Sequence, residues 1–468
     1  MTINHDYIIV APATGGGGAI AIIRVSGPGS LELCDKIFKA RGSSKKVSEQ
    51  DGYTSIYGDI AGNDQIIDDV IINVYRAPHS YTGEDSAEIS CHASPYIQHK
   101  ILQLLISNGA SPARPGEFTQ RAFLNGRMDL SQAEAVADLI ASESEAAHRL
   151  AMHQMRGGFS GDIKKLRKEL LHFASLVELE LDFSEEDVEF ADRARLKELV
   201  KKVKAITDSL AESFQLGNAI RNGIPVAIVG KPNAGKSTLL NAILKDDKAI
   251  VSDIPGTTRD AIEDTATIDG ILYRFIDTAG LRETSDRIET LGIRKTYQKI
   301  RQANIVLLLT EATDSPETIH NSVKAINDQI KGTGKKLILV INKTDLAGKI
   351  HLENIMETLC PENEANCIFM SALSDEDVAQ LKLLLGKIIE KERLTETNSI
   401  VTNMRHYYAL NKTSESLNRV LEGLKTMVPE DLIAMDIRQA IHWLGEITGE
   451  ITTDEILANI FKNFCIGK

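Results

Sequence analysis

The spacing of hydrophobic positions changes several times along the chain, and these changes divide it into regions. Up to about residue 120, short apolar runs alternate with turn residues, a pattern typical of strands in a small α/β unit. From Asp129 to about Asn222, and again from His406 to Phe461, apolar residues recur every three or four positions, which predicts helices. Between these helical regions, apolar runs of strand length alternate with helical patterns, which predicts a parallel sheet covered by helices.

The individual elements follow from the same patterns. Strands are predicted at Tyr7–Val10, Ala19–Val25, Val70–Tyr75, Ala87–Cys91, Val226–Val229, Tyr273–Ile276, Leu337–Ile341 and Cys367–Met370. Long helices are predicted at Ile163–Leu181, Leu196–Leu216, Asp375–Glu390, His406–Leu424, Asp431–Thr448 and Thr453–Phe461. Ser131 and Glu134 have the spacing of a capping box, Gly157-Gly158 interrupts a helical pattern, and Asp269-Gly270 predicts a hairpin turn.

The sharpest motif follows the apolar run that ends at Val229. Residues 230–237 read Gly-Lys-Pro-Asn-Ala-Gly-Lys-Ser and fit the phosphate-binding pattern G-x-x-x-x-G-K-[ST] between a strand and a helix. The glycines let backbone N–H groups point at an anion, Lys236 neutralises the outer phosphates, and the Ser237 hydroxyl binds Mg²⁺. We therefore expect nucleotide contacts from Gly230, Asn233, Ala234, Gly235, Lys236, Ser237 and Thr238.

Three later motifs, each at the end of a predicted strand, select guanine. Asp277, at the start of Asp277-Thr278-Ala279-Gly280, can hold the metal through water, and the glycine lets a backbone N–H approach the terminal phosphate. Asp345 can accept two hydrogen bonds from the guanine edge that adenine lacks. It ends the motif Asn342-Lys343-Thr344-Asp345, and Ser371-Ala372-Leu373 offers a backbone N–H to the guanine carbonyl. The four motifs in this order predict GTP binding.

A loop between the first two motifs is suited to the terminal phosphate and its metal. It reads Ser252-Asp253-Ile254-Pro255-Gly256-Thr257-Thr258, and Thr258 is the expected second Mg²⁺ ligand. Leu281 stands where small signalling GTPases carry the glutamine that orients the attacking water, so hydrolysis must be arranged otherwise. Asn233 could supply an oxygen to a monovalent cation in the place of an arginine finger, or it could simply tolerate the turn of the loop.

Length, charge and cysteine content narrow the class of protein. The 468 residues suggest about three domains, and a formal net charge of −13 disfavours a protein that coats nucleic acid non-specifically. Contact with RNA would have to be local or supplied by a partner. The sequence has no apolar run that could cross a bilayer and no basic-then-apolar leader, which favours a cytoplasmic protein with no membrane contact. Its five scattered cysteines indicate neither a disulfide framework nor a zinc site.

Neither helical region has enough apolar positions to close a bundle alone, so we expect the two to pack together. The predicted fold class is α/β plus α, with a P-loop GTPase domain inserted into a discontinuous helical domain. The predicted limits are 1–120 for an N-terminal α/β domain, 121–222 for the first helical part, 223–390 for a Ras-like GTPase domain, and 391–468 for the second helical part.

Three N-terminal segments carry more charge than a scaffold needs. They are Arg24–Gly27, Ser80–Asp85 with Glu88 beyond it, and Arg114–Arg127. Arg24 ends an apolar strand, where a charge is costly unless it is paired or belongs to a site. The four glycines at residues 15–18 favour a hairpin connection over a close approach to a ligand.

These segments also carry a family resemblance. The run Arg114-Pro-Gly-Glu-Phe-Thr-Gln-Arg-Ala-Phe-Leu-Asn-Gly-Arg-Met-Asp-Leu130, the GTPase motifs with Asp277-Thr-Ala-Gly-Leu-Arg-Glu283, and the terminus Phe464-Cys-Ile-Gly-Lys468 resemble the tRNA-modification GTPase MnmE (TrmE) family. The resemblance extends from Ile8 to Lys468. It implies a reduced-folate-binding N-terminal domain that forms a homodimer, and a flavin (FAD)-dependent partner protein with which the dimer forms a heterotetramer.

The activity that the resemblance implies is modification of tRNA. A one-carbon unit from 5-formyl- or methylene-tetrahydrofolate, with nitrogen from glycine or ammonium, is added at C5 of the wobble uridine of certain tRNAs. Folate contacts fall on Arg24, Glu88, Arg127 and Lys468, and a K⁺ ion is held by Asn233, Ser252, Ile254 and Thr257. The catalytic residues are Glu289, acting through water, and Cys465, whose thiol could be a nucleophile near a lysine or could be inert.

Two other functions share some of these motifs. A ribosome-assembly or signalling switch has the same GTPase motifs but no need of a folate pocket. A folate-dependent one-carbon transferase that acts on a small molecule would need neither tRNA nor a flavoprotein.

Overall fold

The computed structural model describes residues 6–15, 17–42, 44–62, 65–182, 193–245, 264–276, 299–359, 366–393, 399–426, 428–462 and 464–467. These residues form two compact units, each described here by itself. One unit contains residues 1–141, 151–208 and 408–468, and the other contains residues 142–150 and 209–407. Both units are discontinuous in sequence, as a domain inserted into a helical body requires.

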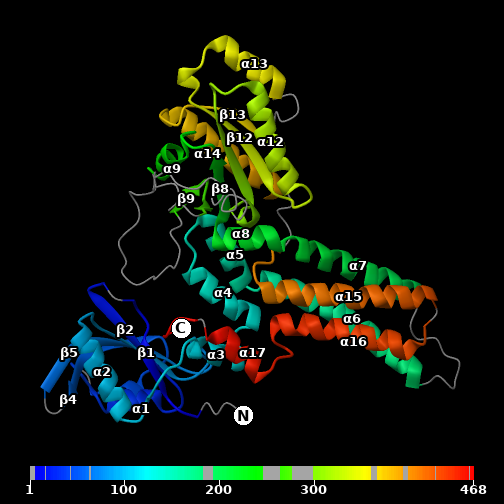
Figure 1. Ribbon diagram of the computed structural model, residues 1–468. Coiled ribbons are helices and arrows are strands. Elements are labelled where there is room, and N and C mark those ends of the chain that lie inside the picture. Colours follow the sequence, from blue (N-terminus) through cyan, green and yellow to red (C-terminus); the bar gives the residue numbers. More distant parts are fainter. Residues whose placement is uncertain are drawn as a thin grey trace. The chain divides into compact units, whose positions relative to one another are not determined.

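The first unit begins with a seven-stranded sheet in the order β3-β4-β5-β6-β2-β1-β7 (Figure 1). Its strands are β1 Ile9–Pro12, β2 Ile20–Ser26, β3 Phe38–Ala40, β4 Thr54–Gly62, β5 Gln65–Tyr75, β6 Ser86–His92 and β7 Ser111–Pro112. Its helices are α1 Ser30–Asp35, α2 Pro95–Ser107 and α3 Glu117–Leu124. Alternate apolar residues of β2, β5 and β6 enter one buried cluster with α1 and α2. The glycine-containing segment joins the antiparallel strands β1 and β2, as the hairpin prediction requires.

Helices from both ends of the chain make up the rest of this unit. The described helices are α4 Leu130–Ile140, α6 Gly158–Asp182, α16 Glu430–Thr448 and α17 Asp454–Phe461. Three further helices, α5 Glu145–Met155, α7 Arg193–Glu212 and α15 Met404–Thr426, have residues in both units. The Ser414 hydroxyl of α15 donates to the Asp208 carboxylate of α7, and Arg167 of α6 pairs with Glu450 after α16. The helical regions on either side of the insertion therefore pack together, as predicted.

One predicted helix start is wrong by two residues. Asp129, and not Ser131, is the N-cap of α4, and its carboxylate accepts from the Gln132 N–H at 3.0 Å. The Gln132 side chain accepts in return from the Asp129 N–H at 2.9 Å, so the capping box exists two residues earlier than its predicted position. Asp129 also pairs with Lys164 at 2.8 Å, and this added charged partner favours it as the cap.

The second unit is built on a six-stranded sheet in the order β13-β12-β11-β8-β10-β9. Its strands are β8 Ile224–Gly230, β9 Asp264–Ile268, β10 Ile271–Phe275, β11 Ile305–Glu311, β12 Lys336–Asn342 and β13 Cys367–Phe369. All neighbours are parallel except β9 and β10, which form the predicted hairpin with positive φ at Asp269 (49°) and Gly270 (72°). Its remaining helices are α8 Phe214–Asn222, α9 Lys236–Leu244, α12 Pro316–Ile330, α13 Lys349–Leu359 and α14 Asp375–Arg393.

Helices cover both faces of this sheet. Alternate strand residues such as Val226 and Ile228 pack against α9 and α14, while Ala227 and Val229 pack against α12 and α13. Near-continuous apolar strands are what such a doubly covered parallel sheet needs. Among the described helices, none combines the length and the apolar content needed to span a lipid bilayer.

Candidate nucleotide and folate sites

The phosphate-binding loop follows β8 and opens helix α9. Gly230 has φ 150°, and a Cβ there would lie 2.3 Å from the Leu309 carbonyl oxygen, so a side chain would not fit. Gly235 is the N-cap of α9 with φ 94°, and Asn233 also has a positive φ of 65°. The loop therefore directs backbone N–H groups and the positive end of a helix dipole toward one point, the geometry that binds phosphate.

Lys236 lies folded over this loop. Its ammonium donates to the carbonyl oxygens of Gly230 at 3.0 Å and of Lys231 at 2.6 Å. Burial, together with the charge of Lys299, lowers the pKa of Lys236 below its ordinary value. An anion bound at the loop would offset both effects, because a partly desolvated ammonium gains most from an opposite charge.

Asn342 ties three of the predicted motifs together. Its side chain is buried, with its amide nitrogen donating to the Ala234 carbonyl oxygen at 2.8 Å. Its amide oxygen accepts from the Ala372 N–H at 2.9 Å. A Cβ on Gly235 would come within 2.2 Å of the Asn342 amide nitrogen. Asn342 is thus a bridge between the phosphate-binding loop and the loop predicted to contact the base, and it has little room to move.

The base-binding segments lie beside this bridge. Lys343 has a positive φ of 63° and its ammonium pairs with Glu311 at 2.8 Å, a partner that the sequence motifs do not indicate. Asp345 and Thr344 are in a short 3₁₀ turn, and Asp345 is exposed. The Ser371 N–H donates to Asp377 at 2.8 Å, whereas Leu373 is 80% exposed. The structure thus leaves the Asp345 carboxylate accessible to a guanine edge.

Several predicted site residues lie outside the described residues. They are Ser252, Asp253, Ile254, Pro255, Gly256, Thr257, Thr258, Asp277, Thr278, Ala279, Gly280, Glu289 and Lys468. Their predicted roles stay predictions. Ser237 and Thr238 are described, in the first turn of α9.

Arg24 and Glu88 form the centre of the second candidate site. They are cross-strand partners in the register of β2 and β6. The guanidinium donates to the Glu88 carboxylate at 3.0 Å and 2.9 Å through two nitrogens, and its third nitrogen donates to the Gly467 carbonyl oxygen at 3.2 Å. Arg24 also lies over the rings of Tyr81 and Phe118, at 5.1 Å and 5.6 Å from their centroids. The positive charge of Arg24, near the end of β2, is therefore paired, as expected for a charge on an apolar strand.

The C-terminal segment is held against the N-terminal sheet at this point. The Cys465 carbonyl oxygen accepts from the Gly116 N–H at 3.3 Å, and Gly467 has φ 93°. A Cβ on Gly467 would lie 2.0 Å from the Pro12 carbonyl oxygen, so only glycine allows this approach. Cys465 itself is a free, exposed thiol.

Cys34 and Cys91 contrast with Cys465. Burial raises the pKa of Cys34 to about 12 and that of Cys91 to about 11, so both stay protonated near neutral pH. Of the described cysteines, Cys465 has the exposure that a reactive thiol needs.

Arg127 is the remaining described residue of the predicted folate set. It is exposed, and its side-chain carbons lie close to Gly83, in the segment that also carries Tyr81. Arg24 is thus hydrogen-bonded both to Glu88 and to the C-terminal segment. Arg127 lies beside the loop Ser80–Asp85.

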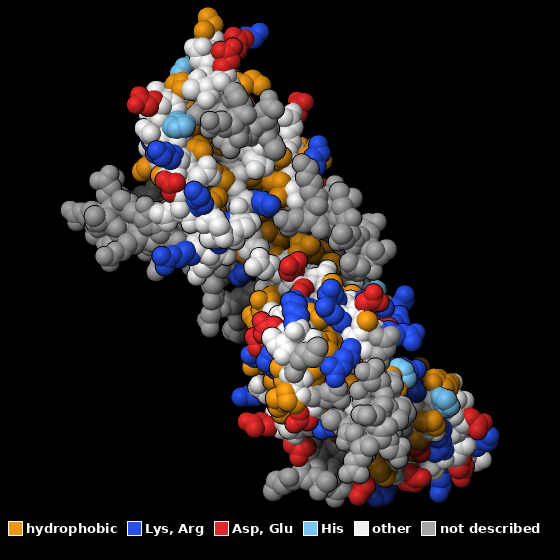
Figure 2. Space-filling view, turned by 90° about the vertical axis from the view of Figure 1, so that its right-hand side faces the viewer, with side chains coloured by type: hydrophobic (Ala, Val, Ile, Leu, Met, Phe, Trp, Pro, Cys, Tyr) orange, Lys and Arg blue, Asp and Glu red, His pale blue; other side chains and the backbone are white. Residues whose placement is uncertain are grey.

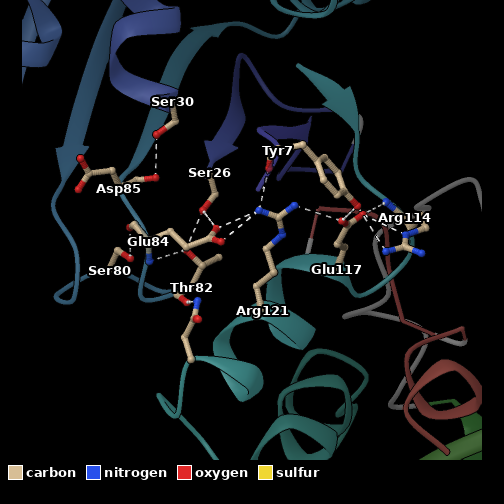
Figure 3. Close-up of polar contacts among 11 residues, drawn as sticks. Tyr7, Ser26, Ser30, Ser80, Thr82, Glu84, Asp85, Arg114, Glu117 and Arg121 are labelled. Atoms are coloured by element: carbon tan, nitrogen blue, oxygen red, sulfur yellow. Dashed lines mark hydrogen bonds and ion pairs between the residues drawn. The ribbon is translucent and has the colours of Figure 1, made fainter. Parts of the chain in front are cut away.

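A buried polar network, which the sequence patterns did not single out, holds that loop (Figure 3). The Arg121 side chain is fully buried and pairs with Glu84 at 3.1 Å and with Glu117 at 3.4 Å. Arg121 also donates to the Tyr7 carbonyl oxygen at 3.0 Å, and the Tyr7 hydroxyl donates to Glu117 at 2.5 Å. The signal in the sequence was a high density of charge in Arg114–Arg127 and Ser80–Asp85, but only the fold reveals that the two segments neutralise each other.

Glu117 stays ionised in this network. Burial opposes its charge, but hydrogen bonds from the Tyr7 hydroxyl and the Arg114 backbone N–H outweigh burial and lower the pKa of the Glu117 carboxyl. The network keeps its charges because each one has partners.

Taken together, the fold and the first site define a P-loop GTPase domain inserted into a helical body. Models of two protein families match the chain, the "GTP-binding protein TrmE N-terminus" at residues 8–127 and the "MnmE helical domain" at residues 130–465. The chain belongs to the tRNA modification GTPase MnmE family, and it is a GTPase that takes part in tRNA modification.

Full-length relatives support this assignment. The chain is 51% identical to the tRNA modification GTPase MnmE of Bacteroides thetaiotaomicron over 99% of this chain and 100% of the relative. It is 52% identical to that of Parabacteroides distasonis over 98% of this chain and 99% of the relative. Among solved structures, Era of Aquifex aeolicus with GDP·AlF₄⁻ matches 41% of this chain and 65% of its own at 24% identity, with a TM-score of 0.26.

Proposed function

We propose that this GTPase acts with a flavin (FAD)-dependent partner protein to modify C5 of the wobble uridine of certain tRNAs. The product is an aminomethyl or carboxymethylaminomethyl group, and its one-carbon unit comes from tetrahydrofolate. The observation that carries the proposal is the Arg24–Glu88–Gly467 cluster, because it joins the N-terminal sheet to the segment with the exposed Cys465 thiol. A GTPase switch without chemistry has no need of such a cluster.

The residues at this cluster have the chemistry that a reduced folate requires. A folate carries carboxylates at one end and a pterin ring with N–H donors at the other. Glu88 supplies an acceptor for the ring, and Arg24, paired with it at 2.9 Å, holds that carboxylate in position. Arg127, with Lys468 from the family resemblance, would supply cations for the carboxylates. The rings of Tyr81 and Phe118 beside Arg24 add flat apolar surface. When bound, 5-formyl- or methylene-tetrahydrofolate supplies the one-carbon unit, while Cys465 is the candidate nucleophile of this chain.

For GTP hydrolysis we propose that this chain's residues position the phosphates and the attacking water. Lys236 offsets the phosphate charge, Ser237 and Thr258 hold Mg²⁺, and Asp345 selects guanine. Asn233, with Ser252, Ile254 and Thr257, would hold K⁺ where other GTPases use an arginine finger. Glu289 would orient the attacking water through a second water.

We further propose that the chain is a homodimer, that the dimer forms a heterotetramer with the flavin partner, and that the complex works in the cytoplasm, where it meets its tRNA. The four sequence regions 1–120, 121–222, 223–390 and 391–468 would act as folate-binding, helical, GTPase and helical parts. Binding of GTP would bring the two GTPase domains of the dimer together. The helical body would move as a result, and this movement would change the modification site.

Mass spectrometry of tRNA nucleosides from cells with and without the gene tests this function. We expect a modified wobble uridine to disappear on deletion, and to return with the intact gene but not with one that is truncated before Cys465. An unchanged nucleoside profile in the deletion strain would contradict the proposal, and a simultaneous defect in ribosomal subunits would identify an assembly switch.

A further inference from the structure

A cavity of about 660 Å³ lies within the GTPase unit, at the edge of the sheet opposite the phosphate-binding loop. It is lined by α8 (Phe214, Gln215, Asn218, Ala219 and Asn222), by the start of β8, by the hairpin strands β9 (Thr265) and β10 (Leu272 and Arg274), and by the segments that lead into β11 and β12. The Asn304 N–H donates to the Pro225 carbonyl oxygen at 2.8 Å, and the Lys336 N–H donates to the Asn304 carbonyl oxygen at 3.0 Å. The cavity is therefore at the amino ends of β8, β11 and β12.

The phosphate-binding loop and Asn342 are at the carboxyl ends of the same strands. Strand β8 has seven residues, and a strand rises about 3.3 Å per residue, so the two sites are roughly 20 Å apart. The cavity cannot be part of the GTP site, and its lining includes none of the predicted nucleotide, cation or folate residues.

The lining of the cavity is polar and cationic. Arg274 and Lys335 contribute positive charge, and the amide side chains of Gln215, Asn218 and Asn304 add donors. None of the described residues that line the cavity is Asp or Glu. The Lys335 ammonium donates to the carbonyl oxygens of Arg301 at 2.7 Å and Ala303 at 2.6 Å, which fixes its charge at the wall.

More cations flank the cavity. Arg221, Arg301, Lys331 and Lys336 are exposed and lie within two residues of the lining. The same stretches contain two described carboxylates, Glu212 and Asp264. With Arg274 and Lys335, these stretches contain six cations. Glu263, which lies outside the described residues, raises the carboxylates in the sequence to three, so the excess is three positive charges in a chain whose net charge is −13.

This excess is a local feature. On the face drawn in Figure 2, basic and acidic side chains are interspersed among the described residues and no single sign covers it. A cation-rich concavity without carboxylate lining attracts phosphate groups, and cations that extend beyond the cavity fit a ligand larger than a metabolite.

We propose that the cavity and its cations, which we call the basal basic site, bind phosphate groups, and that these belong to the tRNA backbone. The inference rests on the proposed function, since tRNA is the RNA that this chain meets in its modification role. Donors from one rigid sheet edge would fix the position of the tRNA without reading its sequence. Because α8 leads directly into β8, contact here would also place the tRNA beside the start of the GTPase domain.

The test is binding of a fluorescent wobble-uridine tRNA transcript to the full-length, GDP-saturated chain over a KCl series. The double variant Arg301→Gln/Lys331→Gln removes two exposed cations at the site. The control Lys324→Gln/Lys349→Gln removes two exposed cations from α12 and α13. We expect the site variant to bind roughly tenfold more weakly, and the slope of log affinity against log salt to fall by about 1.5. The control should behave as the wild type.

Lys335→Gln gives a second variant inside the cavity, and its GTP hydrolysis rate reports whether the domain is intact. Equal tRNA affinity and salt slope in the wild type and both site variants would overturn the proposal, as would an equal loss in the control. A parallel titration with tripolyphosphate identifies the source of the phosphate. If tripolyphosphate binding depends on the site but tRNA binding does not, the ligand is a small phosphorylated molecule and the tRNA assignment is wrong.

The binding data test the basal basic site, and the deletion strain tests the proposed function, so the two can fail separately. If deletion of the gene leaves the wobble uridine unchanged, the proposed function fails whatever the binding data show. If deletion removes the modification and the site variants still bind tRNA as the wild type does, only the basal basic site fails.

Discussion

The nucleotide site and the Arg24–Glu88–Gly467 cluster are built in opposite ways. The phosphate-binding loop is contiguous, and most of its groups belong to the backbone between β8 and α9. The Arg24–Glu88–Gly467 cluster uses side chains on neighbouring strands and a carbonyl 443 residues away from Arg24. A site formed by consecutive backbone groups can be recognised from a short sequence motif. A site formed by side chains that are distant in sequence can be recognised only once the fold is known.

The two sites also differ in what supports them. One buried amide, Asn342, bridges the loops of the nucleotide site. The loop beside Arg24 is instead supported by a charged network around Arg121, whose side chain is fully buried. Substitutions in the Arg121 network should therefore mainly lower stability, whereas substitutions at Arg24 and in the nucleotide site should mainly lower ligand affinity.

The largest expected effect is that of Arg121→Met. This substitution leaves the Glu84 and Glu117 carboxylates without their shared cation, and we expect it to lower the unfolding free energy of the N-terminal sheet by about 3–5 kcal/mol. Urea unfolding followed by hydrogen exchange in β1 and β2 measures this. Arg41→Met, which removes an exposed arginine paired with Asp59 and Asp69, is the control and should cost far less. Similar losses for the two variants would contradict a structural role for the buried network.

Arg24→Gln comes next. It removes the guanidinium that holds Glu88, the proposed acceptor for the folate ring. A charge-assisted bond is worth about 1.5–3 kcal/mol, so folate affinity should fall by roughly ten- to hundredfold. GTP hydrolysis by the isolated chain should not change. Calorimetric titration with 5-formyl-tetrahydrofolate measures the affinity, and undiminished binding would remove Arg24 from the folate site.

Asn342→Ala should weaken GTP and GDP binding by roughly ten- to hundredfold, because it leaves the Ala234 carbonyl and the Ala372 N–H without a partner in a buried place. Fluorescent-nucleotide titration measures this, and folate affinity provides the internal control. Asn321→Ala, on the exposed surface of α12, is the matched substitution and should have no effect. Normal nucleotide affinity in Asn342→Ala would show that the bridge is dispensable.

The smallest expected effect is a change in how the free energy of unfolding depends on pH. The pKa of Glu117 is lower in the folded protein than in the unfolded chain, so its contribution to stability is present above the unfolded value of about 4.3 and is lost as the pH falls toward the folded value. Glu117→Gln should therefore unfold with a shallower pH dependence than the wild type below about pH 5. Identical slopes would mean that Glu117 does not stay ionised in the fold.

The sequence predicted most of the long helices and the strands that carry the GTPase motifs, but it missed the strands β4 and β11 and the helices α2 and α12. The predicted helix Asp431–Thr448 agrees within one residue with α16, Glu430–Thr448. Apolar residues recur every three or four positions along this segment, which favours a helix over a strand. The start of α4 was missed because Asp129, Ser131 and Gln132 all have capping chemistry, and tertiary contact with Lys164 favours the first.

Pairings between distant segments could not be read from spacing at all. Nothing local to Arg121 indicates that it faces Glu84, and the partnership of Arg24 with Glu88 depends on the register of β2 against β6. The resemblance to a family supplied Arg24 and Glu88, but not the backbone carbonyl of Gly467, because a conformational role for glycine leaves no chemical mark in the sequence.

The most direct test of the account is reconstitution of the modification with the purified chain, its flavin partner, GTP, glycine and tetrahydrofolate that carries a ¹³C-labelled one-carbon unit. Nucleoside mass spectrometry then follows the label. The account predicts ¹³C at the wobble uridine with the wild-type chain and, at a subsaturating folate concentration, far less with Arg24→Gln although GTP is still hydrolysed. Label in the tRNA that is unaffected by Arg24→Gln, or an unlabelled product, would contradict it.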